Sequence, residues 1–335
     1  MIMLHLRAAL TLCAALIATP ALAQSTPVTV ALDWTPNTNH IGLFVAEAKG
    51  FYEEAGVAVE ILPYTDTSAA TLVANNIADF GILGSISLLT QRTAGADLVA
   101  TYALVQTETG RLVFKADRDD IQRPSDLDGK IYAGFGSGWE AALIGTIIRH
   151  DGGKGEFETV TLGTSAYEAL ANGAVDFTLE VYTWEGVKAE LDGPAQRAFR
   201  YADYGVPDQH TNFLGTTSAY LAEHPDTAEA FLSASRRGYA FAVEHPDEAA
   251  DILVAANSEA LLDRDFVRAS LQALIDGHYL QAEDGTIGTI DPAKMEAMGD
   301  FLFDAGLLKD GDGVAVREKP DFSAYYSNDY LGIEP

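Results

Sequence analysis

The chain repeats an alternation of strand and helix patterns over much of its length. Residues 28–33, VTVALD, are rich in β-formers. Residues 42–56 show helical spacing of apolar residues and end at a glycine, and residues 57–64 form a second β-rich run. This order is that of a βαβ unit, the building block of parallel sheets. The alternation therefore predicts an α/β fold with a mainly parallel sheet flanked by helices.

The strand and helix alternation begins again near residue 115. A strand pattern at 130–135 leads into a glycine-rich loop and a helical pattern, and further strand, helix and strand patterns extend to residue 182. From about residue 218 the pattern is mostly helical. The second half thus repeats the architecture of the first without repeating its residues, which predicts two similar α/β lobes.

The first residues have the features of an export signal. Arg7 supplies a positive charge, a short apolar run follows, and ALA at 21–23 offers small residues for cleavage. Removing residues 1–23 as a signal peptide leaves 312 of the 335 residues, and the single cysteine, Cys13, is lost with them. We therefore expect a soluble, exported, periplasmic protein without stable membrane insertion, disulfides or cysteine-bound metal.

The formal charge of −28 arises from 49 acidic and 21 basic residues. Such a surface repels nucleic acid and anionic lipid, so neither is an expected partner. The sequence EHPD occurs at 223–226 and again at 244–247, where its histidines suggest metal ligands. Proline followed by acids is also a helix start signal, and neither histidine has a second ligand at metal spacing. We expect two helix starts, no metal site and no cofactor.

Four loops follow predicted strands, at residues 33–40, 84–87, 134–140 and 180–186. Ligands of open parallel sheets bind at the carboxyl ends of the strands. Because the four loops come from both predicted lobes, we expect the ligand site in a cleft between the lobes.

Three of the four loops combine acids with aromatic residues, and none of the four contains lysine or arginine. Sites for phosphate or carboxylate usually contain such basic groups. The loop GFGSGWE at 134–140 resembles a phosphate cradle but has neither P-loop nor dinucleotide spacing. A flat, aromatic ligand rich in N–H donors therefore fits better. Arg111 is the one basic residue that we expect within reach of the cleft.

An enzyme is the alternative class. After residue 23 the chain has no cysteine and no G-x-S-x-G motif, so a nucleophilic mechanism lacks its usual residues. Asp33 and His40 are seven positions apart across a strand-to-helix turn, and they need not touch. A binding protein is therefore favoured over an enzyme.

Several segments together resemble a known family. They are LDWTPNTNHIGLFVAEAKGFYEEAG from residue 32, DFGILG from 79, DLDGKIYAGFGSGWE from 126, DFTLEVYTWEG from 176 and HPDEAADIL from 245. They look like the type II periplasmic binding proteins of ABC importers. Within that group they most resemble the branch that binds the pyrimidine precursor of thiamine, which is related to the fungal pyrimidine synthases.

The resemblance implies the two-lobed periplasmic-binding-protein type II fold, with a ligand cleft between lobes that the chain joins by crossing twice. We expect the crossings near Phe114–Ala116 and Leu214–Thr216. Lobe 1 would then contain residues 27–114 and 216–335, and lobe 2 residues 115–215. The resemblance implies nine ligand-binding residues, to which we add His40 and Ser85 from the four loops. The expected ligand-binding set is therefore Trp34, Asn37, Asn39, His40, Ser85, Gly136, Ser137, Glu140, Glu180, Tyr182 and Trp184.

The resulting hypothesis is a monomeric solute receptor that delivers formylaminopyrimidine or hydroxymethylpyrimidine to an ABC transporter permease. We expect one of Trp34, Tyr182 and Trp184 to stack on the small aromatic heterocyclic ligand. Glu180 would accept from its exocyclic amine, and Asn37 or Asn39 would bond its ring nitrogens.

Two alternatives remain. Riboflavin or another flat heterocycle is the alternative ligand for the same fold. A pyrimidine synthase is the alternative activity, but the region that corresponds to the cysteine cluster of the fungal synthases reads NFLGTT at 212–217 and contains no cysteine. The loop expected to carry their histidine reads GSISLL at 84–89.

Overall fold

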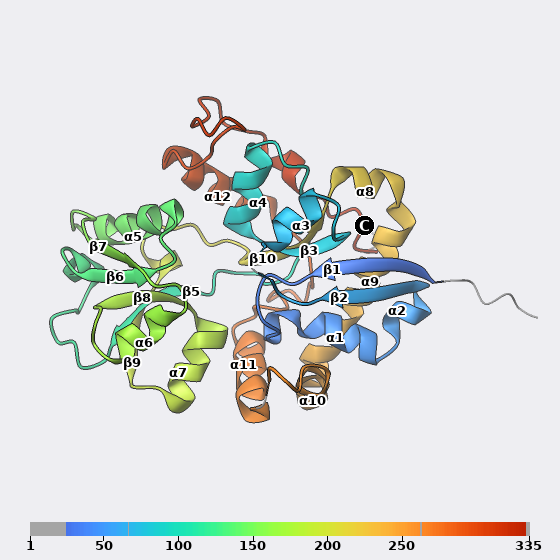
Figure 1. The fold of residues 1–335 in the computed structure, drawn as a ribbon, viewed down its shortest axis with the longest axis horizontal. Coiled ribbons are helices and arrows are strands. Elements are labelled where there is room, and N and C mark those ends of the chain that lie inside the picture. Colours follow the sequence, from blue (N-terminus) through green and yellow to red (C-terminus); the bar gives the residue numbers. More distant parts are fainter. Residues whose placement is uncertain (1–24, 66, 262, 333–335) are drawn as a thin grey trace, which may run out of the picture.

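Two five-stranded sheets form the framework of the protein (Figure 1). The computed structural model describes residues 25–65, 67–261 and 263–332. The first sheet has the order β2-β1-β3-β10-β4 and the second β7-β6-β8-β5-β9. In each sheet one strand, β10 or β5, runs antiparallel to both neighbours, so the sheets are mainly parallel, as predicted. The first sheet contains β1 (Thr26–Ala31), β2 (Val57–Leu62), β3 (Phe80–Gly84), β4 (Val99–Ala103) and β10 (Asn212–Thr216); the second contains β5 (Gly110–Lys115), β6 (Ile131–Gly134), β7 (Glu158–Thr161), β8 (Phe177–Val181) and β9 (Gln196–Arg200).

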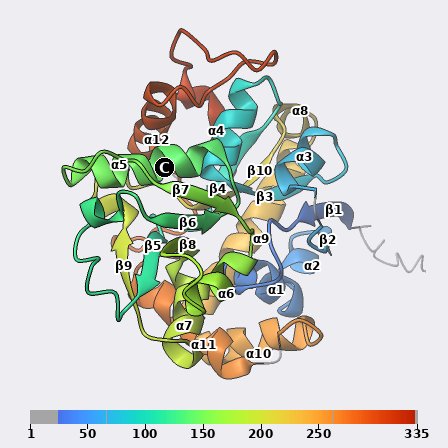
Figure 2. The same ribbon diagram turned by 60° about the vertical axis from the view of Figure 1, so that its left-hand side comes forward.

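Helices flank both sheets (Figures 1 and 2). We call the first sheet with its helices the first lobe, and the second sheet with its helices the second lobe. The helices of the first lobe are α1 (Ile41–Ala48), α2 (Phe51–Glu54), α3 (Ala69–Ala74), α4 (Ser85–Thr93), α8 (Ser218–Glu223), α9 (Pro225–Glu244), α10 (Pro246–Ala256), α11 (Arg264–Asp276) and α12 (Pro292–Asp304). Those of the second lobe are α5 (Gly138–His150), α6 (Ser165–Ala171) and α7 (Val187–Asp192). Among the described residues, no helix has the length and apolar character needed to cross a bilayer.

The chain changes sheets earlier than predicted. The expected crossings near Phe114–Ala116 and Leu214–Thr216 fall within β5 and β10 or at their ends. All of β5 pairs with β8 and β9, and all of β10 pairs with β3 and β4. The change of sheet therefore takes place before each of these strands, at residues 104–109 and 201–211. The apolar runs of β5 and β10 do not reveal which sheet each strand joins, because a strand of either sheet would be buried and apolar.

The proline-containing repeats begin helices, as predicted. Helix α9 starts at Pro225 and α10 at Pro246, with acids in their first turns. The preceding His224 and His245 lie against the rings of Tyr220 and Phe241, at centroid distances of 5.0 and 4.5 Å. These histidines thus stand at helix boundaries. The single helix expected over residues 42–56 is instead two helices, because the chain turns at Gly50 with φ of 74°.

Helices α1 and α9 approach each other closely in the core of the first lobe. A Cβ atom at Gly238 would lie 2.0 Å from the carbonyl oxygen of Gly42 and 3.0 Å from Ala46 Cβ. A Cβ atom at Gly42 would lie 2.3 Å from the ring of Tyr239. The two glycines therefore allow backbone contact that brings α9 onto the helix that follows the Trp34 loop.

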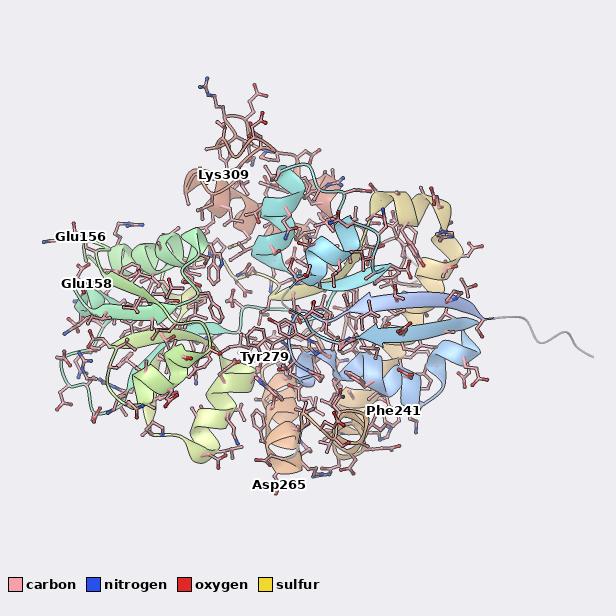
Figure 3. The ribbon with its side chains drawn as sticks, in the orientation of Figure 1. Glu156, Glu158, Phe241, Asp265, Tyr279 and Lys309 are labelled. Carbon is pink, nitrogen blue, oxygen red and sulfur yellow. The ribbon has the colours of Figure 1, made fainter. Side chains whose placement is uncertain are left out.

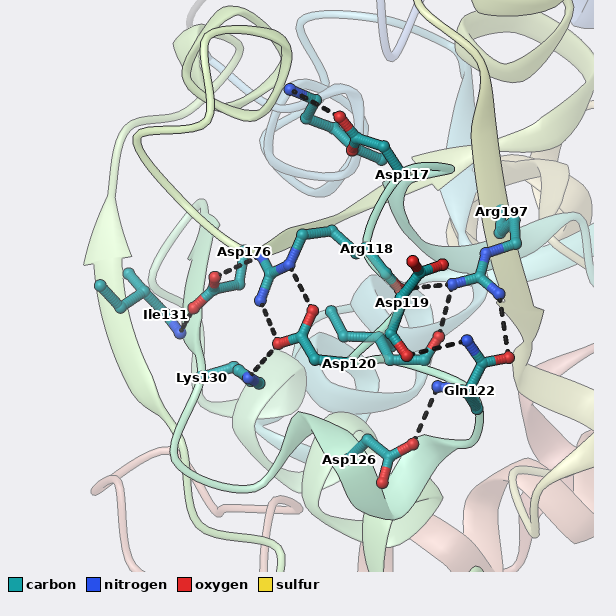
Figure 4. A network of polar contacts seen from close by, with 12 residues as sticks. Asp117, Arg118, Asp119, Asp120, Gln122, Asp126, Lys130, Ile131, Asp176 and Arg197 are labelled. Atoms are coloured by element: carbon teal, nitrogen blue, oxygen red, sulfur yellow. Dashed lines mark hydrogen bonds and ion pairs between the residues drawn. The ribbon is translucent and has the colours of Figure 1, made fainter.

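A polar network fixes the connection from β5 to β6 in the second lobe (Figure 4). Arg118 donates to Asp120 at 2.7 Å and to Asp176 at 2.5 Å, and Asp176 also accepts the Ile131 N–H at 2.7 Å. Lys130 donates to Asp120 at 2.5 Å. Hydrogen bonds from Arg118 and Lys130 hold the pKa of Asp120 well below its usual range. The network thereby anchors the end of this connection at the start of β6.

We predict that Gly238→Ala destabilises the protein and that Gly145→Ala does not. Both glycines lie inside helices, so both changes gain about 1 kcal/mol of helix propensity. At Gly238 the new methyl meets backbone, and overpacking of this kind costs about 1–3 kcal/mol or more. At Gly145 it meets only the movable end of Arg149. Urea unfolding of the two variants measures the difference, and equal stability of Gly238→Ala and wild type would contradict the close contact.

Candidate functional site

The carboxyl ends of the strands open toward a cleft between the two lobes. A cavity of about 280 Å³, which we call the central cavity, lies at this position. From the first lobe and its connecting segment come Asp33, Trp34, Asn37, Asn39, Gly84, Thr211 and Asn212. From the second lobe come Phe135, Tyr167, Leu179, Val181, Trp184 and Glu185. The structure therefore brings three of the predicted first-lobe residues, Trp34, Asn37 and Asn39, together with Trp184.

Two larger cavities adjoin the central cavity. The Glu108 cavity, of about 610 Å³, shares Gly84, Leu179, Val181 and Thr211 with it. The Lys188 cavity, of about 750 Å³, shares Trp34, Tyr167, Trp184 and Glu185 with it. The central cavity thus lies between the two larger cavities and shares part of its lining with each of them.

The loop after β1 is stabilised by its own polar side chains. Asn37 caps the short helix η1 (Thr38–His40): its Oδ1 accepts the Asn39 N–H at 2.9 Å, and its Nδ2 donates to Thr35 O at 3.0 Å. The side-chain amide of Asn37 is therefore occupied within the turn. Asn39 also lines the central cavity, and its carbonyl oxygen accepts from the Tyr239 hydroxyl at 2.7 Å.

His40 lies behind the cavity wall, although it was predicted to bind ligand. It is fully buried, its Nε2 lies 2.9 Å from Asp33 Oδ1, and its Nδ1 accepts the Asn37 N–H at 3.3 Å. Because Nδ1 is an acceptor, the ring proton is on Nε2, which donates to Asp33. His40 lines none of the three cavities; it orients Asp33, whose carboxylate does face the central cavity.

Aromatic side chains from both lobes form the walls. Trp34 lies edge-on to Phe135 across the cleft, with ring centroids 6.4 Å apart, and 5.5 Å from Tyr64 of its own lobe. Trp184 packs on Phe266 of α11 with centroids 4.4 Å apart, while also lining the central cavity. A flat ring in this cavity would therefore meet aromatic faces and edges from both lobes.

The glycine-rich loop is less open than its sequence predicted. Glu140 is buried, and its carboxylate accepts the N–H groups of Phe135 and Gly136 at 3.2 and 3.0 Å. The loop's donors are thus used by its own helix. Gly136, Ser137 and Glu140 line none of the three cavities, and Phe135 lines the central one. Ser85, also expected at the site, lines the Glu108 cavity, and its N–H donates to Thr211 O at 3.2 Å.

Glu180 and Tyr182 are held by Arg111. Arg111 lies opposite Glu180 in the β5–β8 register, and its Nε donates to the Glu180 carboxylate. The guanidinium also lies 4.3 Å from the Tyr182 ring centroid. Burial raises the pKa of Glu180, and Arg111 opposes that rise. Arg111 therefore does reach the cleft region. It neutralises the acid that was expected to accept from the ligand, and Tyr182 lines none of the three cavities.

Two residues outside the predicted ligand-binding set, Glu185 and Asn212, line the central cavity and have buried acceptor atoms without a partner. Glu185 Oε2 is buried and receives no hydrogen bond, and the same is true of Asn212 Oδ1. Burial raises the pKa of Glu185 to about 7. Buried polar atoms are ordinarily paired, so these two are candidates for ligand contact. The only sequence signal was that Glu185 belongs to an acidic loop and Asn212 begins a strand.

The central cavity thus combines aromatic walls with hydrogen-bond acceptors. The carboxylates of Glu185 and Asp33 and the amide oxygen of Asn212 accept hydrogen bonds, and the Asn39 amide offers both roles. Within the described part of the chain, no group of three or more metal-ligating side chains lies together. Chemically, this arrangement suits a flat ring with N–H donors at its edge.

Known proteins are similar to this chain in sequence and in fold. A formylaminopyrimidine-binding protein of Halalkalibacterium halodurans is 27% identical over 282 residues, 82% of this chain and 84% of the relative. A 4-amino-5-hydroxymethyl-2-methylpyrimidine phosphate synthase of Legionella pneumophila is 24% identical over 248 residues, 69% of this chain and 74% of the relative.

The alkanesulfonate-binding protein SsuA of Xanthomonas axonopodis pv. citri, solved with MOPS, has a TM-score of 0.66 at 16% identity, covering 91% of this chain and 99% of its own. This likeness confirms the predicted fold class. A family model described as NMT1/THI5 like matches residues 37–249. The chain therefore belongs to the NMT1/THI5-like family.

Proposed function

We propose that the protein is a solute receptor of an ABC importer that binds an aminopyrimidine precursor of thiamine in the central cavity. The observation that carries this proposal is that Glu185 and Asn212, whose Oε2 and Oδ1 atoms are buried and unpartnered, both line a cavity walled by aromatic rings from both lobes. An exocyclic amine supplies the donors that these two acceptors lack. The ring supplies a flat apolar surface for Trp34 and Trp184.

Glu185 replaces Glu180 in this proposal as the acceptor for the amine. Glu180 is engaged by Arg111, so a ligand would have to displace a buried ion pair to use it. Glu185 has no such partner among the described residues. Asn39 and Asn212 remain to bond ring nitrogens or further N–H groups, while Asn37 and His40 hold the loop.

A relative with a named ligand supports the proposed ligand class. It is named for binding formylaminopyrimidine, and it matches most of the chain. By analogy, we propose that the protein works in the periplasm as a monomer and delivers its ligand to a permease. The proposed signal peptide, residues 1–23, lies outside the described residues.

The side chains that line the central cavity suit binding better than catalysis. The synthase relative raises the possibility of pyrimidine synthesis. The residues lining the central cavity are aromatic rings, carboxylates, amides, one threonine, one glycine and two aliphatic side chains, and they include no histidine or cysteine. We therefore infer a receptor without enzymatic activity.

Calorimetry with formylaminopyrimidine and hydroxymethylpyrimidine tests the ligand class. Stacking and enclosed hydrogen bonds should together give about 8 to 11 kcal/mol, which is micromolar to ten-nanomolar affinity. Binding of riboflavin in place of both pyrimidines would move the assignment to another heterocycle. Absence of binding by all three would contradict the proposal.

We predict that Glu185→Gln weakens binding of the pyrimidine at least tenfold at pH 8. The substitution keeps the shape but removes the charge, and it replaces one acceptor oxygen by a donor NH₂ that faces the ligand's amine. Glu190→Gln is the matched control, because Glu190 is exposed and does not line the central cavity. Equal losses in the two variants would show that the effect is only one of net charge.

The same substitution should stabilise the unliganded protein at high pH. The pKa of Glu185 is about 7 in the folded protein and near 4.5 in the unfolded chain. The folded state therefore binds this proton more tightly, so stability from this group is present below about pH 4.5 and is lost as pH rises through 7. The advantage of Glu185→Gln should grow from about 1 kcal/mol at pH 5 to about 3 kcal/mol at pH 8. Urea unfolding at both pH values measures it, and a variant that is less stable than wild type at pH 8 would refute the unpaired buried charge.

A further inference from the structure

Helix α11 of the first lobe lies beside α7 of the second lobe. In Figure 3, Asp265 marks the outer end of α11, and Tyr279 follows its inner end, near the middle of the molecule. At the outer end, Lys188 of α7 lies 3.5 Å from Asp263. Both of these side chains are about half exposed, so water screens the ion pair and it adds little to the contact. We therefore looked for buried groups further along α11.

The second-lobe segment that α11 contacts is a π-helical turn. Residues Tyr182–Gly186 connect β8 to α7, and the Val187 N–H donates to Tyr182 O, five positions earlier. Two side chains of this turn, those of Trp184 and Glu185, line the central cavity. Turns of this kind are rare and occur frequently at functional sites. How Trp184 and Glu185 meet a ligand thus depends on what holds the turn in place.

A chain of buried hydroxyl groups connects the π-helical turn to the first lobe. Ser270 of α11 donates from Oγ to Thr183 O, and the same Oγ lies 2.6 Å from Thr38 Oγ1. Because Thr183 O can only accept and Ser270 has one hydroxyl hydrogen, Thr38 is the donor to Ser270. Each of the three residues is at most 1% exposed. We call this chain of hydrogen bonds the hydroxyl relay.

The hydroxyl relay lies behind the walls of the central cavity. None of its three residues lines the central, Glu108 or Lys188 cavity. Its two ends directly precede Asn39 and Trp184, which do line the central cavity. Phe266, one turn before Ser270 on α11, packs on Trp184 with ring centroids 4.4 Å apart. One helix thus holds the π-helical turn by a hydrogen bond and by an aromatic contact.

We propose that Ser270 is a positioning residue of the ligand site, which holds Trp184 and Glu185 of the second lobe opposite Asn39 of the first lobe through the hydroxyl relay. This inference rests on the proposed function, because the positioned residues belong to the proposed ligand site. Loss of the relay deprives a buried carbonyl oxygen of its donor and loosens the turn from the first lobe. Affinity then falls with the fraction of molecules in which both walls are in place.

Ser270→Ala should weaken binding of formylaminopyrimidine about tenfold in calorimetry, although Ser270 does not contact the ligand. Ser235→Ala is the matched control. Ser235 is equally buried, donates to Phe231 O at 2.8 Å and lies 2.9 Å from the Tyr52 hydroxyl, and both partners belong to the first lobe. Each substitution removes a buried hydroxyl with two partners, so thermal unfolding should show similar losses of stability. Only Ser270→Ala should lose affinity.

Thr38→Val tests the hydroxyl relay from its other end. Its loss of affinity should be smaller than that of Ser270→Ala, since Ser270 can still donate to Thr183 O. The double variant should bind as weakly as Ser270→Ala alone, because Ser270→Ala already removes both hydrogen bonds of the relay. Additive losses in the double variant would contradict the relay.

An affinity of Ser270→Ala equal to that of Ser235→Ala would overturn the positioning role and leave the proposed function intact. If neither formylaminopyrimidine nor hydroxymethylpyrimidine binds the wild-type protein, the proposed function fails. Small-angle X-ray scattering of the ligand-free proteins then still tests the relay, because loosening of the lobes increases the radius of gyration. We expect this increase in Ser270→Ala and not in Ser235→Ala, and a radius of Ser270→Ala equal to that of wild type would overturn the relay.

Discussion

Hydrogen bonds between the two crossing segments hold the lobes in register, and the cleft depends on them. Leu104 N–H donates to Asn212 O at 3.0 Å, and Thr211 N–H donates to Val105 O at 3.2 Å. The Thr211 hydroxyl donates to Thr107 O at 2.9 Å. From these paired segments one strand enters each sheet antiparallel to its neighbours. The carboxyl ends of the parallel strands in both sheets therefore face the same space, and side chains far apart in sequence meet there.

The sequence was sufficient to predict the α/β architecture, the helix starts at Pro225 and Pro246, and the loops that border the cleft. These features depend on local patterns, namely apolar periodicity, proline and glycine. It was not sufficient to predict which way the polar side chains of those loops turn. Glu140 turns back onto its own loop because two backbone N–H groups lie within reach. Local hydrogen bonds of this kind compete with any ligand for the same carboxylate.

Long-range pairing accounts for the other differences. Arg111 and Glu180 are 69 positions apart, and they meet only because β5 and β8 pair in one particular register. A shift of one residue would place them on opposite faces of the sheet. The same register leaves Glu185, five residues later and beyond the end of β8, without a basic partner among the described residues. Which of two neighbouring acids stays free was thus decided by strand pairing, which a single sequence does not encode locally.

Contacts between the lobes also border the central cavity. Trp34 meets Phe135 across the cleft, and Ser270 of α11 donates to the Thr183 carbonyl oxygen of the second lobe. Trp184 packs on the same helix. Trp34 and Trp184 thus belong both to the contacts between the lobes and to the lining of the central cavity. Enclosure by these aromatic residues lowers the local dielectric and would strengthen a hydrogen bond that a ligand donates to Glu185, so the contacts between the lobes also affect the strength of the proposed ligand contact.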